Sequence, residues 1–298
     1  MAISALGLKM AKQKAEAFLR ENNYSTLPID PLAIASKYDI AVQAKPSSVE
    51  GVSGMLLRHG SSFGIMYATN IASEGFQRFS VAHELGHYFL DGHLDHVLPV
   101  DGNGVRVSHA GFTSGDPYEL EADYFAAGLL MPGNLFKREL KRADSGLTAI
   151  EALAGICRTS ITATAIRYAE LTDDAVAVII STGPVIDYCF MSDAMKSLPQ
   201  LTWLKKGSPV PRETQTFQLN ADPKNVETAK RISAEIDVMD WLGGSRSVII
   251  AEEVVGLGSY GKTLTVLSSE SIGLQAAGWD DEEDDENLIE SWKPRFRK

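Results

Sequence analysis

Two histidines separated by three residues carry the clearest chemistry in this sequence. His83 and His87 enclose Glu84 in the pattern H-E-x-x-H, inside the run 79–90, whose apolar residues predict a helix. Residues four apart lie on nearly the same face of a helix, about 6 Å apart along its axis. The two imidazoles can therefore bind one zinc ion, and Glu84 can act as the general base that takes a proton from water. The alternative is a buried helix whose histidines only satisfy hydrogen bonds.

A catalytic zinc site needs a third protein ligand, and the sequence offers two. His93 follows His87 by six residues, as in the longer pattern H-E-x-x-H-x-x-G-x-x-H. That pattern requires glycine at position 90, where this chain has Leu90. If the helix continues through this point, with its expected end at Asp91 and Gly92, His93 points about 240° away from His87.

The second solution is a carboxylate from another helix, expected to begin near Asp116 and Pro117. Glu119 and Asp123 are four apart and share a face, so Glu119 can bind the metal while Asp123 orients a histidine through its outer N–H. Glu121 lies about 200° around the helix from Glu119, and we expect it to face solvent. Weaker candidates, for stabilising an oxyanion, are His109, Tyr67 and Tyr118.

Length and composition indicate a globular protein of two or three compact units, with 298 residues of which 44% are hydrophobic. The first 19 residues do not resemble a secretory signal, and no apolar run approaches the ~20 residues of a membrane span. We therefore expect a cytoplasmic protein. The two cysteines, Cys157 and Cys189, form no C-x-x-C pair, which argues against a disulfide framework or a zinc ribbon. Much of the net charge of −11 comes from seven consecutive acids at 280–286.

The elements that must position the site begin with two helices, expected over 4–22 and 32–38, the second capped by Asp30 and opened by Pro31. Three short strands follow, at 40–43, 51–57 and 62–67, and predict a small antiparallel sheet. An exposed strand beside a metal can bind an extended peptide through its backbone. The glycine-containing stretch 93–117 predicts an irregular loop, either a lid or a specificity loop.

The residues 78–88 and 119–132, together with the upstream 27–31, resemble the ImmA/IrrE family of zinc metallopeptidases. The resemblance covers roughly residues 1–145. It implies a zincin-like fold of the gluzincin type, in which His83, His87 and Glu119 hold zinc and Glu84 is the catalytic base.

The resemblance also implies a biological role. Members of the family cleave a helix-turn-helix repressor of the Xre type and so induce genes after DNA damage or another stress, or genes of mobile elements and phage defence. Two rival functions stay open: a regulator that binds DNA or a partner around a non-catalytic zinc site, and a ligand sensor whose site binds without turnover.

The remaining chain predicts an overall α+β fold in four parts, with a zincin-like metallopeptidase domain at 1–145. Two short helices at 148–171 resemble a helix-turn-helix connector, placed at 146–173. A hairpin at 175–180 and 185–191, a helix at about 222–241, and strands at 247–251 and 262–267 resemble a GAF-like sensor domain, at 174–275. A small-molecule or nucleic-acid signal can act there. The glycine-rich 256–261 is expected to be a loop, and 276–298 a charged tail.

Overall fold

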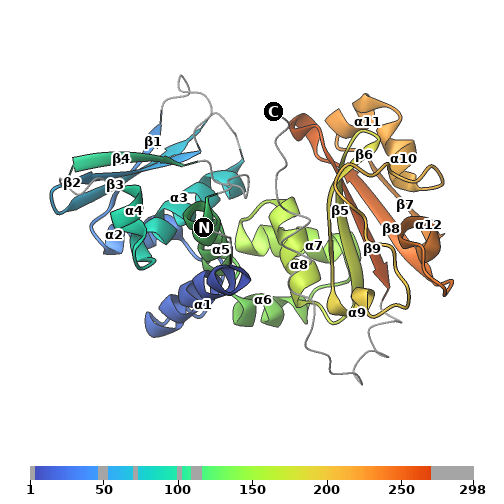
Figure 1. Cartoon of the computed structure of the whole chain (residues 1–298), viewed down its shortest axis with the longest axis horizontal. Coiled ribbons are helices and arrows are strands. Elements are labelled where there is room, and N and C mark those ends of the chain that lie inside the picture. The colour runs from blue at the N-terminus through green and yellow to red at the C-terminus, as the bar shows by residue number, and fades with distance from the viewer. Residues whose placement is uncertain (1–3, 46–52, 70–72, 99–102, 109–115, 270–298) are drawn as a thin grey trace. The chain divides into compact units, whose positions relative to one another are not determined.

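The computed structural model describes residues 4–45, 53–69, 73–98, 103–108 and 116–269 (Figure 1). The fold is α+β, and the described residues divide into two compact units. The first holds 4–138 with 154–160, and the second holds 139–153 with 161–269. The predicted charged tail and His109 lie outside the described residues.

The first unit opens with the two helices expected from the sequence. Helix α1 (Ala5–Glu21) begins after Ser4, whose hydroxyl caps the first turn, and α2 (Pro31–Lys37) begins after the cap Asp30. Buried residues recur every three to four positions along α1, at Leu8, Ala11, Ala15 and Leu19.

A four-stranded sheet follows, with strands in the order β1-β3-β2-β4. The strands are β1 (Ala41–Lys45), β2 (Gly54–His59), β3 (Ser62–Ala68) and β4 (Asn103–Ser108). The expectation of an antiparallel sheet is wrong for one pair, because β1 runs parallel to β3. Since β2 lies between them in the chain, the connection is long enough to return to the same end of the sheet. Leu56 and Ile65 are opposite one another and fully buried, on strands that pack against the next helix.

That helix, α3 (Glu74–Phe89), carries the H-E-x-x-H pattern and begins after the cap Ser73. It ends before the expected Asp91, because Leu90 is already extended. Gly92, with φ +78°, then reverses the chain into the short helix α4 (His93–Val97). The stretch 93–117 is therefore less irregular than predicted, since it also contains β4, whose hydrogen-bonding partner is the distant strand β2.

The helix that carries Glu119 is α5 (Pro117–Leu130), capped by Asp116 and followed by α6 (Gly133–Leu140). It packs against both α3 and α1. Small residues allow these close approaches: a Cβ on Gly86 of α3 would lie 3.0 Å from the Ala122 Cα, and one on Gly128 would lie 2.8 Å from the Lys12 carbonyl oxygen. The same end of α3 also makes aromatic contacts, with the Phe89 ring 4.9 Å from that of Tyr38.

Two short helices, as predicted, lie between α6 and the next strand of the chain. They are α7 (Gly146–Cys157) and α8 (Ile161–Leu171), and their axes differ by 112°. In the described parts of the chain, no single helix has the length and apolarity to cross a membrane, and α7 with α8 is the one bent pair that meets this test by length and composition.

The second unit is built on a five-stranded antiparallel sheet in the order β6-β5-β9-β8-β7. The strands are β5 (Ala175–Thr182), β6 (Val185–Met191), β7 (Arg231–Asp237), β8 (Ile249–Gly256) and β9 (Thr263–Ser269). Helix α8 packs on β5 and β6. One core of this unit includes Ala177 and Ile179 of β5, together with Met195 and Trp241.

Short helices complete this unit: α9 (Asp193–Lys196), α10 (Gln215–Asn220), α11 (Pro223–Glu227), α12 (Val238–Leu242) and the 3-10 turn η1 (Gly258–Tyr260). The single helix expected over about 222–241 is wrong. Only its two ends are helical, and its middle is β7, which pairs along its whole length with β8. The glycine-rich 256–261 forms the predicted connection between two strands.

Candidate metal centre

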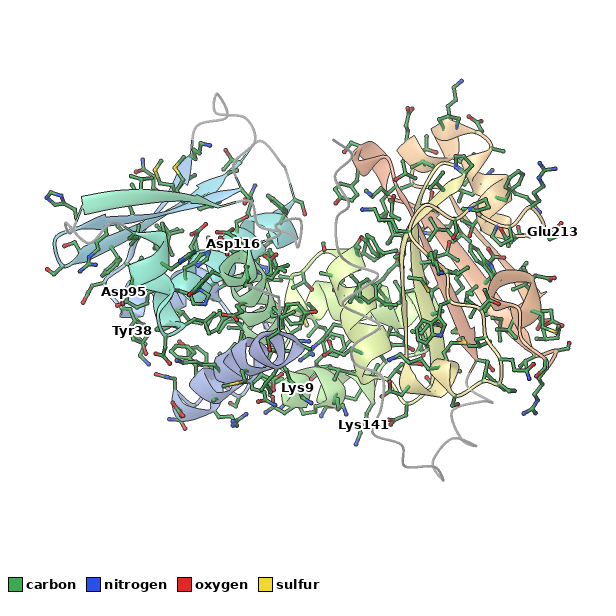
Figure 2. The ribbon with its side chains drawn as sticks, viewed as in Figure 1. Lys9, Tyr38, Asp95, Asp116, Lys141 and Glu213 are labelled. Carbon is green, nitrogen blue, oxygen red and sulfur yellow. The ribbon has the colours of Figure 1, made fainter. Side chains whose placement is uncertain are left out.

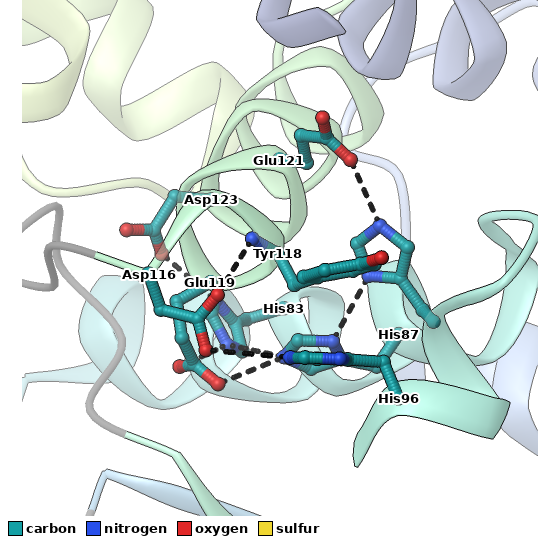
Figure 3. Close-up of polar contacts among 9 residues, drawn as sticks. His83, His87, His96, Asp116, Tyr118, Glu119, Glu121 and Asp123 are labelled. Atoms are coloured by element: carbon teal, nitrogen blue, oxygen red, sulfur yellow. Dashed lines mark hydrogen bonds and ion pairs between the residues drawn. The ribbon is translucent and has the colours of Figure 1, made fainter. Parts of the chain in front are cut away.

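Three buried side chains from two helices converge in the first unit (Figure 3). His83 and His87 come from α3, and Glu119 comes from the first turn of α5. The Nε2 atoms of the two histidines are 3.1 Å apart, and each lies 3.4 Å from an oxygen of Glu119. The structure thus brings together the three residues that sequence spacing selected as ligands.

These separations suit a zinc ion. Ligand atoms about 2.0–2.1 Å from a tetrahedral zinc stand about 3.3 Å from one another. The three observed separations, of 3.1, 3.4 and 3.4 Å, lie close to that value. Two imidazole nitrogens and one carboxylate, with a fourth position left for water or substrate, form a donor set typical of a catalytic zinc site.

Asp123 lies behind the first histidine, one turn along α5 from Glu119. Its Oδ1 is 2.8 Å from Nδ1 of His83, and both side chains are buried. The Nδ1–H of His83 can donate to this carboxylate while its Nε2 faces the cluster, so Asp123 stands where an orienting residue must stand.

The charges in the cluster are strongly coupled. Burial of His83 lowers its pKa, but the Asp123 carboxylate and hydrogen bonds with Asp123 and Glu119 outweigh that effect and raise the pKa to about 10. Burial of Glu119 favours its neutral form, yet hydrogen bonds with His83 and His87 hold its pKa far below the usual range. The carboxylates and the histidines of the cluster therefore each favour the charged form of the other.

Glu84, the expected base, is fully buried between α3 and the sheet. A Cβ on Gly54, the first residue of β2, would lie only 2.4 Å from Oε1 of Glu84. The carboxylate therefore occupies space that exists because position 54 has no side chain. Its negative charge also contributes to the raised pKa of the neighbouring His83.

His93 and Glu121 differ from their expected positions. His93 is not in the three-residue cluster, because its Nδ1 lies 3.1 Å from Nδ1 of His87, the ring nitrogen that faces away from the cluster. Glu121 was expected to face solvent, and that expectation is wrong. Its Oε2 lies 3.0 Å from Nε2 of His93, and its side chain is 30% exposed. Burial lowers the pKa of His93 to about 4, although its hydrogen bond with Glu121 acts in the opposite direction.

The weaker candidates lie around this centre. The Tyr118 ring stacks on His96 of α4 at 3.8 Å (Figure 3). It also meets the His93 ring edge-on at 5.0 Å, so it supports the short helix. Tyr67 is on β3, opposite Gly54 of β2. Their proposed role in stabilising an oxyanion stays a prediction.

Fold and site together define an α+β protein with a buried cluster of two histidines and a glutamate that can bind a metal. Comparison with known families adds a second finding: residues 35–165 match the family model of the IrrE N-terminal-like domain, a peptidase domain. The match spans just under half of the chain and includes all three candidate ligands. It supports the resemblance to the ImmA/IrrE family for this segment.

Comparison with curated protein sequences gives no match. Among solved structures, 11 chains match. One is a transcriptional regulator from Mycobacterium tuberculosis, with 14% sequence identity and a TM-score of 0.55, covering 89% of this chain and 78% of that one. At this identity the likeness concerns the fold alone. The GAF-like assignment of the second unit stays a prediction.

Proposed function

We propose that this chain is a zinc-dependent endopeptidase that cleaves a transcriptional repressor of the helix-turn-helix, Xre type. The observation that carries the proposal is the convergence of the Nε2 atoms of His83 and His87 with the Glu119 carboxylate, inside a segment that matches a peptidase family. The position of Glu84, next to the first ligand in sequence and buried with it, supplies the base that hydrolysis requires.

In this proposal His83, His87 and Glu119 hold the ion, and Asp123 orients the His83 ring. When bound, zinc supplies Lewis acidity toward a peptide carbonyl and lowers the pKa of water at the site. Glu84 takes a proton from the attacking water and returns it to the amine that leaves. The burial of Glu84 keeps its carboxylate in one place for both transfers.

The substrate class and the regulation rest on the family resemblance. A repressor cleaved in this way would release genes that respond to DNA damage or other stress, or genes of mobile elements or phage defence. We further propose that the second unit acts as a sensor that gates cleavage. The five-stranded sheet flanked by short helices in that unit is compatible with a small sensor module.

The decisive experiment compares wild type with Glu84→Gln, each expressed together with the Xre-type repressor encoded nearest to the gene. The amide keeps the shape of the side chain but cannot act as a base, so zinc content should be unchanged while repressor fragments disappear, a loss of about 10²-fold or more. Zinc content is measured by elemental analysis, and fragments by mass spectrometry.

The control is Glu213→Gln, at an exposed position in the loop that precedes α10 (Figure 2). It changes the charge in the same way far along the chain from the cluster and should cleave as wild type does. Fragments from Glu84→Gln equal to those of wild type would refute the assigned base. Intact repressor in every sample, despite bound zinc, would refute the proposed substrate class.

A second function is a regulator that binds DNA or a protein partner and keeps zinc without turnover. One observation favours it: α7 and α8 form a sharply bent pair of short helices. Gel-shift assays with DNA from the repressor's own control region distinguish the two functions. Specific binding without any cleavage would support the regulator.

A further inference from the structure

The chain returns to the metal centre after α3 has ended. Leu90 is extended, Gly92 adopts φ +78°, and the backbone N–H of His93 donates to the Leu90 carbonyl. This turn places the His93 ring, which is 1% exposed, beside His87. A continuous helix would have directed the same ring elsewhere.

The hydrogen bonds between these rings follow from a count of protons. Nε2 of His87 faces His83 and Glu119, so it is the atom that binds a metal. A neutral imidazole has one proton, which then lies on Nδ1 and must be donated outward. An acceptor within reach is Nδ1 of His93, at 3.1 Å.

The same count continues to Glu121. Because Nδ1 of His93 accepts, the proton of that ring lies on Nε2, which is 3.0 Å from Oε2 of Glu121 (Figure 3). Each donor in this series of hydrogen bonds meets an acceptor, and the series ends at the Glu121 carboxylate. The other oxygen of Glu121 is close to α1, where a Cβ on Gly7 would lie 2.7 Å from Oε1. Glu121 therefore lies close to the backbone of α1 at Gly7.

We propose that His93 and Glu121 are positioning residues for His87, joined to it in the hydrogen-bonded chain Glu121–His93–His87. Helix α5 then serves both ligand histidines: Asp123 orients His83 directly, and Glu121 orients His87 through His93. The proposal rests on the metal site of the proposed function but not on proteolysis. It explains why Glu121, which the sequence predicts to face solvent, and His93, which lies outside the three-residue cluster, are in contact.

The expected consequence concerns metal affinity. Without an acceptor for its Nδ1–H, the His87 ring can rotate or hold its proton on Nε2, where the proton competes with the metal. Loss of such an outer partner weakens metal binding by about 10- to 100-fold.

The test is His93→Phe in the full chain, with the zinc dissociation constant measured by competition with a chromophoric chelator. Phenylalanine keeps a ring against Tyr118 but has no acceptor, so we expect zinc binding about 10- to 100-fold weaker. Glu121→Gln keeps an oxygen that can accept from Nε2–H and should bind zinc within about threefold of wild type, whereas Glu121→Ala should bind more weakly than Glu121→Gln.

His96→Phe is the matched control. It changes the same residue type on the same short helix, where the ring stacks on Tyr118. Its zinc affinity should equal that of wild type. Equal losses in His93→Phe and His96→Phe would show that α4 only packs, and an unchanged affinity in His93→Phe would also overturn the proposal.

A measurement on the wild type covers the case in which His93→Phe does not fold. Nitrogen NMR of the zinc-loaded protein labelled at histidine should show His87 protonated at Nδ1 and His93 at Nε2. The opposite tautomer at either ring would contradict the proposed hydrogen bonds between Glu121, His93 and His87. Zinc bound without cleavage would contradict the proposed function alone, while absence of zinc binding would contradict both proposals.

Discussion

Glycine at position 54 determines where the carboxylate of Glu84 can lie. The backbone of β2 passes so close to the end of this side chain that a methyl group there would lie 2.4 Å from Oε1 and 3.2 Å from Cδ. The three candidate ligand side chains come from α3 and α5. A substitution at position 54 can therefore displace the Glu84 carboxylate while His83, His87 and Glu119 stay in place.

We expect Gly54→Ala to impair catalysis without removing the metal. The far end of a flexible side chain can move at small cost, so the fold should persist while the carboxylate leaves its position. A misplaced catalytic group lowers turnover by about 10- to 100-fold. Turnover of the repressor and the zinc dissociation constant, measured on the same samples, check this.

Gly64→Ala on the neighbouring strand β3 serves as the comparison. Its Cβ would meet the Ala41 carbonyl oxygen at 3.6 Å and the Leu57 Cβ at 4.0 Å, which are ordinary contacts. This variant should cleave as wild type does. If Gly54→Ala is equally active, Glu84 does not depend on the space beside β2.

At the scale of elements, the site depends on how closely α3 and α5 approach. Gly86 lies between the candidate ligands His83 and His87 in sequence, one residue before the second of them, and faces Ala122 of α5. A Cβ at position 86 would stand 3.0 Å from the Ala122 Cα and 3.1 Å from its carbonyl oxygen. Since both contacts are with backbone atoms, a larger residue must push the helices apart.

Gly86→Val should therefore weaken both stability and metal binding. Overpacking of this kind costs about 1–3 kcal/mol in the free energy of unfolding. Denaturant melts of the metal-free protein measure the loss in free energy of unfolding, and chelator competition measures the accompanying loss of zinc affinity.

Gly155→Val on α7 is the matched helical variant, because that glycine is exposed and its Cβ would meet nothing within 4 Å. Its free energy of unfolding should change by no more than about 0.5 kcal/mol. Similar losses in both variants would mean that valine itself, and not the contact with Ala122, is responsible.

For the whole molecule, the relevant feature is the division into two units. The candidate ligands, their orienting partners and Glu84 all belong to the first unit, whereas the five-stranded sheet belongs to the second. A ligand stabilises the part of a protein that binds it, by an amount set by its concentration and affinity.

Removal of zinc with a chelator should therefore affect the units differently. In the full chain, hydrogen exchange should rise in peptides from α3 and α5 and stay unchanged in those from β5 to β9. Mass spectrometry of exchanged peptides measures this. Exchange that rises equally in the sheet would show that metal occupancy is transmitted to the second unit.

Two errors of prediction show why local pattern is not sufficient. Ile232 and Ile236 are four apart, a spacing that suits one face of a helix and equally one face of a strand. Pairing with Val254 and Ile250 of β8 selects the strand. Likewise β4, in the predicted irregular loop, exists because β2 supplies its hydrogen bonds.

The sequence by itself determined the local features of this protein: the helix with His83, Glu84 and His87, the second helix with Glu119 and Asp123, and the caps at Asp30 and Asp116. These depend on spacings of a few residues and on side chains that bond to their own backbone, which the order of residues contains directly.

Only the tertiary structure decided that His93 meets His87, that Glu121 meets His93, and that Gly54 borders Glu84. His93 and Glu121 are 28 residues apart. Their contact depends on where α3 stops and how Gly92 turns the chain, and on the packing of α5 against α3. Such contacts arise from the path of the backbone between elements, which no local period of the sequence expresses.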